Sequence, residues 1–202
     1  MPKVTGCKAR VVVNSRGEKT IEAEVYIGDV FGRYAAPSGL SKGTFEAPPF
    51  PRGGLTEAVK LVQEDIAPKF VGFEFSSQRE VDDFLRRIDG TENYSKIGGA
   101  TAVSISIATA EAAAKSLGIP LYQWIAGDKK VTRLPIPLGN IVGGGKHSLG
   151  RASDIQEFLA APLNAKSYKE GIFSLISLHE KVGELLAERD QFFLGGRNDE
   201  GA

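Results

Sequence analysis

The sequence predicts an α+β protein in two parts: a three-stranded antiparallel meander covered by helices, then a shorter region of strands and one long helix. Turn residues separate three strand-like segments, which is typical of a meander. The three segments are residues 8–13, 20–27 and 30–36. In the second segment Ile21, Ala23 and Val25 alternate with Glu22 and Glu24. Such a sheet has one apolar face, so a layer of helices is expected to cover it.

Apolar residues at helical spacing supply that layer. They predict helices over residues 56–67, 77–89, 100–117 and 121–126. The second helix begins at a capping box, in which Ser77 is followed three residues later by Glu80, and it ends at Gly90. We therefore expect the first part of the chain to be a complete α+β domain.

A polar connector over residues 128–133 is the predicted boundary, which divides the chain into domains at 1–130 and 131–202. Beyond the connector, strands are predicted at residues 134–138, 155–160 and 191–194. A second capping box, Ser167 with Glu170, opens a long helix that reaches about Arg189. The predicted buried side of this helix consists of Ile172, Phe173, Ile176, Val182 and Leu186.

The composition excludes several classes of partner. The chain has 25 Lys and Arg residues and 25 Asp and Glu residues, so its formal net charge is zero. It lacks the basic surplus of nucleic-acid and membrane-surface binders, and neither kind of partner is expected. The first ten residues lack the apolar core of a signal peptide, and the single cysteine cannot form an internal disulfide. A cytoplasmic protein is predicted, with Cys7 a small buried hydrophobe in a strand; the alternative is a reactive thiol.

Four polar segments could carry chemistry. The loop over residues 38–43 has glycines near both ends, which suits either an ordinary turn or a lid that offers Ser41 to a metal. Residues 143–147, Gly-Gly-Gly-Lys-His, lack the spacing of a phosphate-binding P-loop, but they place His147 on a loop after a strand. Gln156 and Glu157 lie in an apolar strand, where a carboxylate is either functional or turned to solvent. Asp199 and Glu200 form a further acidic point.

Taken in order, short motifs along nearly the whole chain are similar to those of the enolase family. They are Asn14-Ser15-Arg16-Gly17 and residues 36–43, 66–68, 89–91, 95–98, 118–122, 134–137, 144–147, 156–158 and 199–201. Each motif is short, but their shared order is specific. The resemblance implies an N-terminal capping domain followed by the beginning of a β/α (TIM-like) barrel.

The resemblance also implies an activity, namely magnesium-dependent dehydration of 2-phosphoglycerate to phosphoenolpyruvate in glycolysis and gluconeogenesis. In this family a lysine removes the proton next to a carboxylate and a carboxylic acid assists departure of hydroxide. By resemblance Glu200 and Glu157 are the catalytic carboxylates, while His147, Gln156 and Glu157 bind the small anionic substrate. Ser41 matches the serine that reaches the second Mg²⁺.

Family members are about twice as long, so the resemblance also implies that the lysine base and the ligands of the tight metal site are absent from this chain. The chain is then expected to be incomplete and inactive alone, and to form a homo-oligomer or associate with a missing C-terminal part. The chain diverges at several motif positions. The family's Asn-Gly-Gly reads Gly143-Gly144-Gly145, and its Gly-Asp-Glu-Gly-Gly reads Asn198-Asp199-Glu200-Gly201-Ala202. The alternative function is a non-catalytic enolase-like protein of assembly or regulation.

Overall fold

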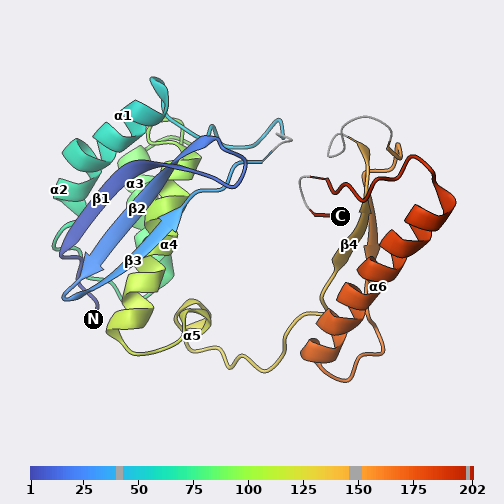
Figure 1. Ribbon diagram of the computed structural model, residues 1–202. Helices are drawn as coiled ribbons and strands as arrows, with labels where there is room; N and C mark the ends of the chain where they lie inside the picture. The colour runs from blue at the N-terminus through green and yellow to red at the C-terminus, as the bar shows by residue number, and fades with distance from the viewer. Residues whose placement is uncertain (40–42, 146–151, 199–200) are drawn as a thin grey trace. The chain divides into compact units, whose positions relative to one another are not determined.

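The computed structural model describes residues 1–39, 43–145, 152–198 and 201–202, and these residues form two compact units, Met1–Val131 and Thr132–Ala202 (Figure 1). The larger, N-terminal unit contains a sheet and most of the helices. The C-terminal unit contains a strand pair and one long helix. Each unit has its own packing and is described separately.

The sheet of the N-terminal unit is the predicted antiparallel meander. Its strands are β1 (Gly6–Val13), β2 (Lys19–Ile27) and β3 (Val30–Ala35), in the order β1-β2-β3. Ala9 pairs with Ala23, and Ala23 with Tyr34. The predicted fold class of this part is therefore confirmed.

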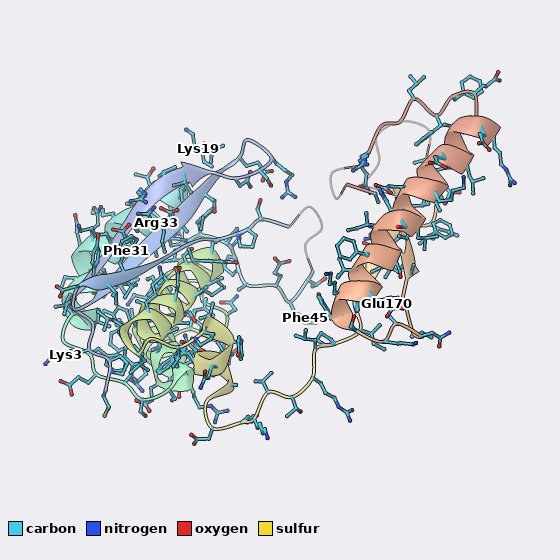
Figure 2. The ribbon with its side chains drawn as sticks, turned by 60° about the horizontal axis from the view of Figure 1, so that its bottom comes forward. Lys3, Lys19, Phe31, Arg33, Phe45 and Glu170 are labelled. Atoms are coloured by element: carbon cyan, nitrogen blue, oxygen red, sulfur yellow. The ribbon has the colours of Figure 1, made fainter. Side chains whose placement is uncertain are left out.

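The two faces of the sheet differ as the alternation in β2 predicts. Ile21, Ala23 and Val25 are completely buried on the inner face. The opposite face carries glutamates between arginines of the neighbouring strands: Arg10 lies 2.5 Å from Glu22, and Arg33 lies 2.6 Å from Glu24. Arg33 and Phe31 extend from the same edge strand (Figure 2), with the guanidinium 5.2 Å from the ring centroid. Glu24 is only 7% exposed, and hydrogen bonds from Tyr26 and Arg33 lower its pKa.

Helix α4 (Gly99–Ser116) covers the inner face (Figure 1). Apart from Ile105, its buried side chains are small, so the helix backbone comes very close to the sheet. Gly32 on β3 lies directly beneath it: a Cβ at this position would be 2.0 Å from the Ala108 carbonyl oxygen and 2.6 Å from the Ala112 amide nitrogen. Ser104 also donates a hydrogen bond to the Ile21 carbonyl, 3.2 Å away. Small residues on both elements therefore set the distance between helix and sheet.

The other helices of this unit complete the core around an aromatic cluster. They are α1 (Gly54–Leu61), the π-helix η1 (Val62–Ile66), α2 (Ala67–Phe70), α3 (Gln78–Asp89) and α5 (Leu121–Ala126). Phe70, Phe75 and Trp124 are buried, and the Phe75 and Trp124 rings meet edge to face at 5.8 Å. The indole N–H of Trp124 donates to Gln78, which holds α5 against α3.

The cap of α3 differs from the predicted capping box by one residue. Glu80 accepts a hydrogen bond from the backbone N–H of Ser76, at 3.1 Å, rather than from that of Ser77. The Ser77 side chain makes no capping hydrogen bond and instead donates to Glu80. In the helix of the C-terminal unit, Ser167 accepts from the Glu170 backbone N–H at 3.1 Å, as predicted, and the Glu170 carboxylate accepts from the backbone N–H of Lys166 at 2.9 Å. In both helices the acidic side chain therefore bonds to the N–H of the residue before the capping-box serine.

Cys7 is buried on the inner side of the sheet, and burial raises the pKa of its thiol to about 12. Because the thiolate is the reactive form, we expect the native protein to resist a thiol reagent such as Ellman's reagent at pH 8. The thiol should react at once in strong denaturant, since unfolding exposes it and restores an ordinary pKa. Rapid modification of the native protein would contradict the buried position.

The C-terminal unit contains β4 (Gly139–Gly143) and β5 (Glu157–Ala160), which pair antiparallel, and α6 (Tyr168–Arg189). The predicted strand at 134–138 is wrong; the strand begins just after it. Pro135 and Pro137 lack an N–H donor, so this segment cannot form a regular ladder. The predicted strand at 191–194 is also wrong. The N–H of Phe192 donates to the Asp190 side chain and that of Phe193 to the Asp190 carbonyl, so a turn uses the donors that a strand needs.

The buried side of α6 agrees with the predicted one only in part. Gly171 and Leu175 are buried and Ile172, Val182 and Leu186 are half-buried, whereas Phe173 is 57% and Ile176 47% exposed. A Cβ on Gly171 would lie 3.1 Å from Pro162 and 3.3 Å from Pro137, so the missing side chain lets the helix approach these prolines. This close contact fixes which side of α6 faces the strands. Large apolar side chains consequently remain exposed on this unit.

Among the described residues, no helix combines the length and the apolar character that crossing a membrane requires.

Candidate functional site

The candidate site lies at one end of the β4–β5 pair, where Gly143 is the cross-strand partner of Glu157. β4 ends there and β5 begins there, so the segments that follow Gly143 and precede Glu157 emerge side by side. Glu157 is half-buried and Gln156 is exposed. Glu157, the first residue of β5, and Gln156 before it therefore place one carboxylate and one amide at this end of the strand pair.

The backbone of Gly144 and Gly145, which follow β4, lies very close to the backbone of the segment that precedes β5. The N–H groups of Gly144 and Gly145 donate to the carbonyls of Gln156 and Ser153, each at 2.8 Å. A Cβ on Gly144 would lie 2.3 Å from the Ile155 carbonyl oxygen and 2.5 Å from that of Ser153. Any side chain at Gly144 would force the two segments apart. The glycines therefore serve close backbone approach at this site rather than phosphate binding.

The last residues of the chain reach the same end of the strand pair. The N–H of Asn198 donates to the Ala202 carbonyl at 3.0 Å, and the N–H of Gly201 donates to the Asn198 carbonyl at 3.1 Å. The N–H of Ala202 donates to the Asn198 side-chain oxygen at 2.9 Å. The Asn198 amide packs against Gly143 at the end of β4. Described residues of three segments are thus brought together, namely residues 143–145, 156–157, and 198 with 201–202.

Three of the predicted site residues, Ser41, His147 and Glu200, lie outside the described residues. Their neighbours in the sequence are described. Gly145 precedes His147 by two residues at the candidate site, and Asn198 and Gly201 lie on either side of Glu200. Ser41 belongs to the loop between β3 and α1 in the N-terminal unit.

The start of that loop is held by the β1–β2 turn. The Ser38 hydroxyl donates to Glu18 at 2.6 Å and accepts from Asn14 and Arg16 at 3.0 and 2.9 Å. Arg16 also donates to the Ser38 carbonyl. Hydrogen bonds from Ser38 and then Asn14 lower the pKa of Glu18, so its carboxylate stays charged at neutral pH.

The end of the loop is held by the first turn of α4. The N–H groups of Gly99 and Ala100 donate to the carbonyls of Pro48 and Pro49, at 2.8 and 3.0 Å. The sequence pattern at residues 14–17 predicted a turn and one of the family motifs, and it did not predict either anchor. The signal for the first one was the concentration of polar side chains in so short a turn.

Among the residues that the structure describes, no cluster of three His, Cys, Asp or Glu side chains could hold a metal. Mg²⁺ keeps several water ligands in its octahedron and is often held by only one or two protein carboxylates. Glu157 is the carboxylate that begins β5 at this end of the strand pair, so the described residues supply part of a magnesium site and do not complete it.

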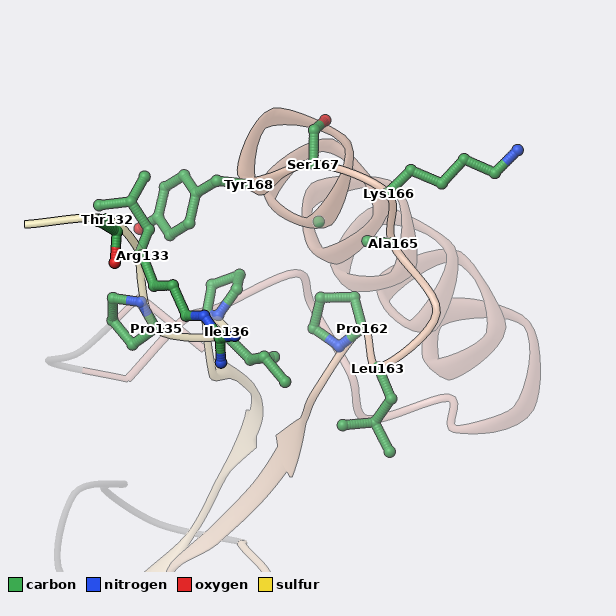
Figure 3. Close-up of a pocket in the computed structure, with 13 residues that line it drawn as sticks. Thr132, Arg133, Pro135, Ile136, Pro162, Leu163, Ala165, Lys166, Ser167 and Tyr168 are labelled. Atoms are coloured by element: carbon green, nitrogen blue, oxygen red, sulfur yellow. The ribbon is translucent and has the colours of Figure 1, made fainter.

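A hollow of about 440 Å³ lies at the opposite end of the strand pair (Figure 3). The residues before β4 and after β5 line it, including Arg133, Pro135 and Pro162, together with Tyr168 at the start of α6. Lys166 extends away from it (Figure 3). Since β4 and β5 are antiparallel, this hollow is separated from Gly143 and Glu157 by the length of the strands. It is not part of the candidate site.

Two family models match the chain. The model described as "Enolase, N-terminal domain" matches residues 4–125, and the model described as "Enolase, C-terminal TIM barrel domain" matches residues 131–202.

The chain is also similar to curated proteins named enolase. That of Methanosphaera stadtmanae is 44% identical over 194 residues, covering 96% of this chain and 47% of the relative. That of Pyrobaculum aerophilum is 44% identical over 199 residues, covering 96% and 47%. That of Halorubrum lacusprofundi is 44% identical over 203 residues, covering 100% and 49%. The chain spans about half the length of these relatives.

Proposed function

Because the chain belongs to the enolase family, we propose that it contributes the N-terminal part of an enzyme that dehydrates 2-phosphoglycerate to phosphoenolpyruvate. The observation that carries the proposal is the convergence of residues 143–145, 156–157, and 198 with 201–202 at one end of the β4–β5 pair. Reacting groups in β/α barrels gather at the face where the parallel strands end. Gly143 ends β4 at this end of the pair, and Glu157 begins the antiparallel β5 there. We assign residues 1–130 to the capping domain and residues 131–202 to the start of the barrel.

Each site residue has a proposed role. Glu200 is the acid that donates a proton to the departing hydroxyl of the substrate, so that water leaves as the carbon–carbon double bond forms. Glu157 assists catalysis and, with Gln156 and His147, holds the anionic substrate. The base that removes the proton next to the carboxylate is a lysine of the half that this chain does not span.

Bound Mg²⁺, which the enolase family uses, would neutralise the negative charge that develops on the substrate carboxylate. Ser41 is the proposed ligand of the second ion. The described residues do not supply a full ligand set, so the tight site is assigned to the second half of the protein.

The first expected result is that the 202-residue chain alone does not turn over 2-phosphoglycerate, because both the base and the tight metal site are missing. Mixing it with the C-terminal part of the Methanosphaera stadtmanae enolase and magnesium should restore phosphoenolpyruvate formation in a coupled assay. Turnover by the chain alone would contradict the assignment of the base. Absence of turnover in the mixture, with binding shown by light scattering, would refute the proposed function.

A matched pair of variants tests the site within that mixture. Glu157→Gln removes a carboxylate but keeps the shape, and we expect turnover to fall by roughly 100-fold or more. Glu184→Gln, on the exposed side of α6, is the control and should leave turnover unchanged. Equal activity of both variants would remove Glu157 from the site.

A non-catalytic role in assembly is the second candidate, and the exposed apolar side chains of the C-terminal unit favour it. Phe158, Phe173 and Ile176 are each between 45% and 57% exposed, which is typical of a surface that another chain covers. On either view we expect the isolated chain to associate, with itself or with the missing part. A clean monomer in light scattering at high concentration would contradict this expectation.

A further inference from the structure

Strand β3 forms an edge of the sheet in the N-terminal unit, because it pairs with β2 on one side only (Figure 1). Ile27 and Val30 face each other across a two-residue turn and exchange backbone hydrogen bonds. Backbone groups of successive residues alternate between the two sides of a strand, so those of Val30 and Gly32 face β2. The N–H and C=O groups of Phe31 and Arg33 therefore point outward, away from the sheet.

Two side chains of α4 bond to these outward groups. The Glu111 carboxylate accepts the N–H of Arg33 at 2.7 Å, and the Lys115 ammonium donates to the carbonyl of Phe31 at 2.9 Å. Glu111 and Lys115 are also paired with each other at 2.8 Å. Four residues along a helix and two along a strand both advance by roughly 6 Å, so the two spacings match. The two side chains thus take the place of hydrogen bonds that a fourth strand would make.

Only a thin layer covers this edge. A hollow of about 440 Å³ lies beside it, lined by Arg33 and Tyr34 of the strand and by Glu111 and Lys115 of the helix, among others. The Glu111 and Lys115 side chains are 34% and 46% exposed. Within the part of the chain that the structure describes, no other strand pairs with β3. The outward backbone groups are therefore shielded by two accessible side chains that do not belong to the core.

We propose that Glu111 and Lys115 close the β3 edge, and that the partner they exclude is the same edge of a second copy of this chain. Unpaired N–H and C=O groups on an edge strand are a template for a further strand, and charged side chains are a common protection. The proposal is independent of the proposed activity. It concerns an interaction surface that the natural chain keeps closed.

The side chains of β3 favour a second copy as the partner. Phe31 and Arg33 lie on one face of the strand (Figure 2), with the guanidinium 5.2 Å from the ring centroid. An antiparallel register that places Phe31 opposite Arg33 of the second copy brings cation and ring together twice across the new pair. The same register pairs their outward backbone groups, since both residues bond on the outer side of the strand.

The double variant Glu111→Ala/Lys115→Ala of the full 202-residue chain tests the proposal. Removing both side chains should lower the Kd of self-association, measured by sedimentation, roughly tenfold or more, because pairing restores backbone hydrogen bonds that alanine leaves unmade. Hydrogen–deuterium exchange in a peptide covering residues 28–36 locates the contact. In the variant this exchange should be faster than in the natural chain at low protein concentration and should slow as the concentration rises. In the natural chain it should not depend on concentration.

Two controls separate the edge from a general loss of charge. Lys181→Ala/Glu184→Ala removes an ion pair of 2.7 Å from the exposed side of α6, and exchange in residues 28–36 should stay that of the natural chain. Glu111→Gln keeps an oxygen acceptor for the Arg33 N–H, so the edge should remain closed.

The single variants Glu111→Ala and Lys115→Ala each free one backbone group and decide the question if the double variant does not fold, which Trp124 fluorescence reports. Each should give a weaker, concentration-dependent slowing of exchange in residues 28–36. Folded variants whose exchange in this peptide is independent of concentration would overturn the proposal. Slowing confined to other peptides, or an equal effect of the α6 control, would overturn it as well.

Discussion

Gly32→Ala is expected to lower the free energy of unfolding of the N-terminal unit by about 3 kcal/mol. The added methyl group would lie 2.0 Å from the Ala108 carbonyl oxygen and 2.6 Å from the Ala112 nitrogen. Both atoms belong to the helix backbone, so no side chain can rotate away, and α4 has to lift from the sheet. Because the interior is densely packed, lifting α4 to admit the methyl group also weakens its other contacts with the sheet.

Urea unfolding followed by tryptophan fluorescence measures this effect. The chain has one tryptophan, Trp124, which is 8% exposed and packs against Phe75, so it reports on the N-terminal unit. Gly43→Ala is the control, since nothing lies within 4 Å of a Cβ at that position. An unchanged midpoint for Gly32→Ala would mean that α4 does not contact β3 at this distance.

Asp89→Ala should be comparably destabilising, by about 3 kcal/mol, because it leaves several buried donors without an acceptor. Asp89 is 2% exposed at the end of α3. One carboxylate oxygen accepts the N–H groups of Lys96 and Ile97, at 3.0 and 2.9 Å. The other accepts the N–H and the hydroxyl of Thr91. The carboxylate therefore organises the whole loop between α3 and α4.

The same residue gives the stability a pH dependence. Burial raises the pKa of Asp89, but the hydrogen bonds from Thr91, Ile97 and Lys96 together outweigh it, so the folded pKa lies below the ordinary 3.8. A depressed folded pKa means that the stabilisation is fully present above the unfolded pKa and is lost as the pH falls through the folded value.

Urea titrations between pH 7 and pH 2.5 test this sign. The stability difference between the natural chain and Asp89→Asn should be constant at neutral pH and should shrink below about pH 4. Asp83→Asn, on the exposed side of the same helix, is the control and should change the stability by less than about 0.5 kcal/mol. A difference that grows on acidification would contradict the role of the charged carboxylate.

Local patterns in the sequence were enough to predict the N-terminal unit. The alternation of Ile21, Ala23 and Val25 predicted both the strand and its buried face, because a period of two has only one structural meaning. Helices with clear ends, such as the one before Gly90, were predicted within a few residues. In these elements the local sequence preference and the final structure agree, so the local pattern was enough to predict them.

The C-terminal unit was less predictable because long-range contacts decide its details. The apolar residues at 134–138 resemble a strand, but Pro135 and Pro137 lack the N–H donors that strand pairing needs. The strand therefore forms in the residues that follow them. Phe173 and Ile176 suit a buried side of α6, but the contact of Gly171 with Pro162 turns the helix away from them. The approach of Asn198 to Gly143 joins residues that no local pattern relates.

The charged sheet face and the uncovered side of α6 should make the two units respond to salt in opposite ways. The pairs of Arg10 with Glu22 and Arg33 with Glu24 are partly open to water, so added sodium chloride screens them and loosens the outer sheet face. Exposed side chains such as Phe173 instead gather more strongly when sulfate is added, and separate on cooling. Sodium chloride is therefore expected to act mainly on the sheet of the N-terminal unit, and sulfate on the association of the chain through its C-terminal unit.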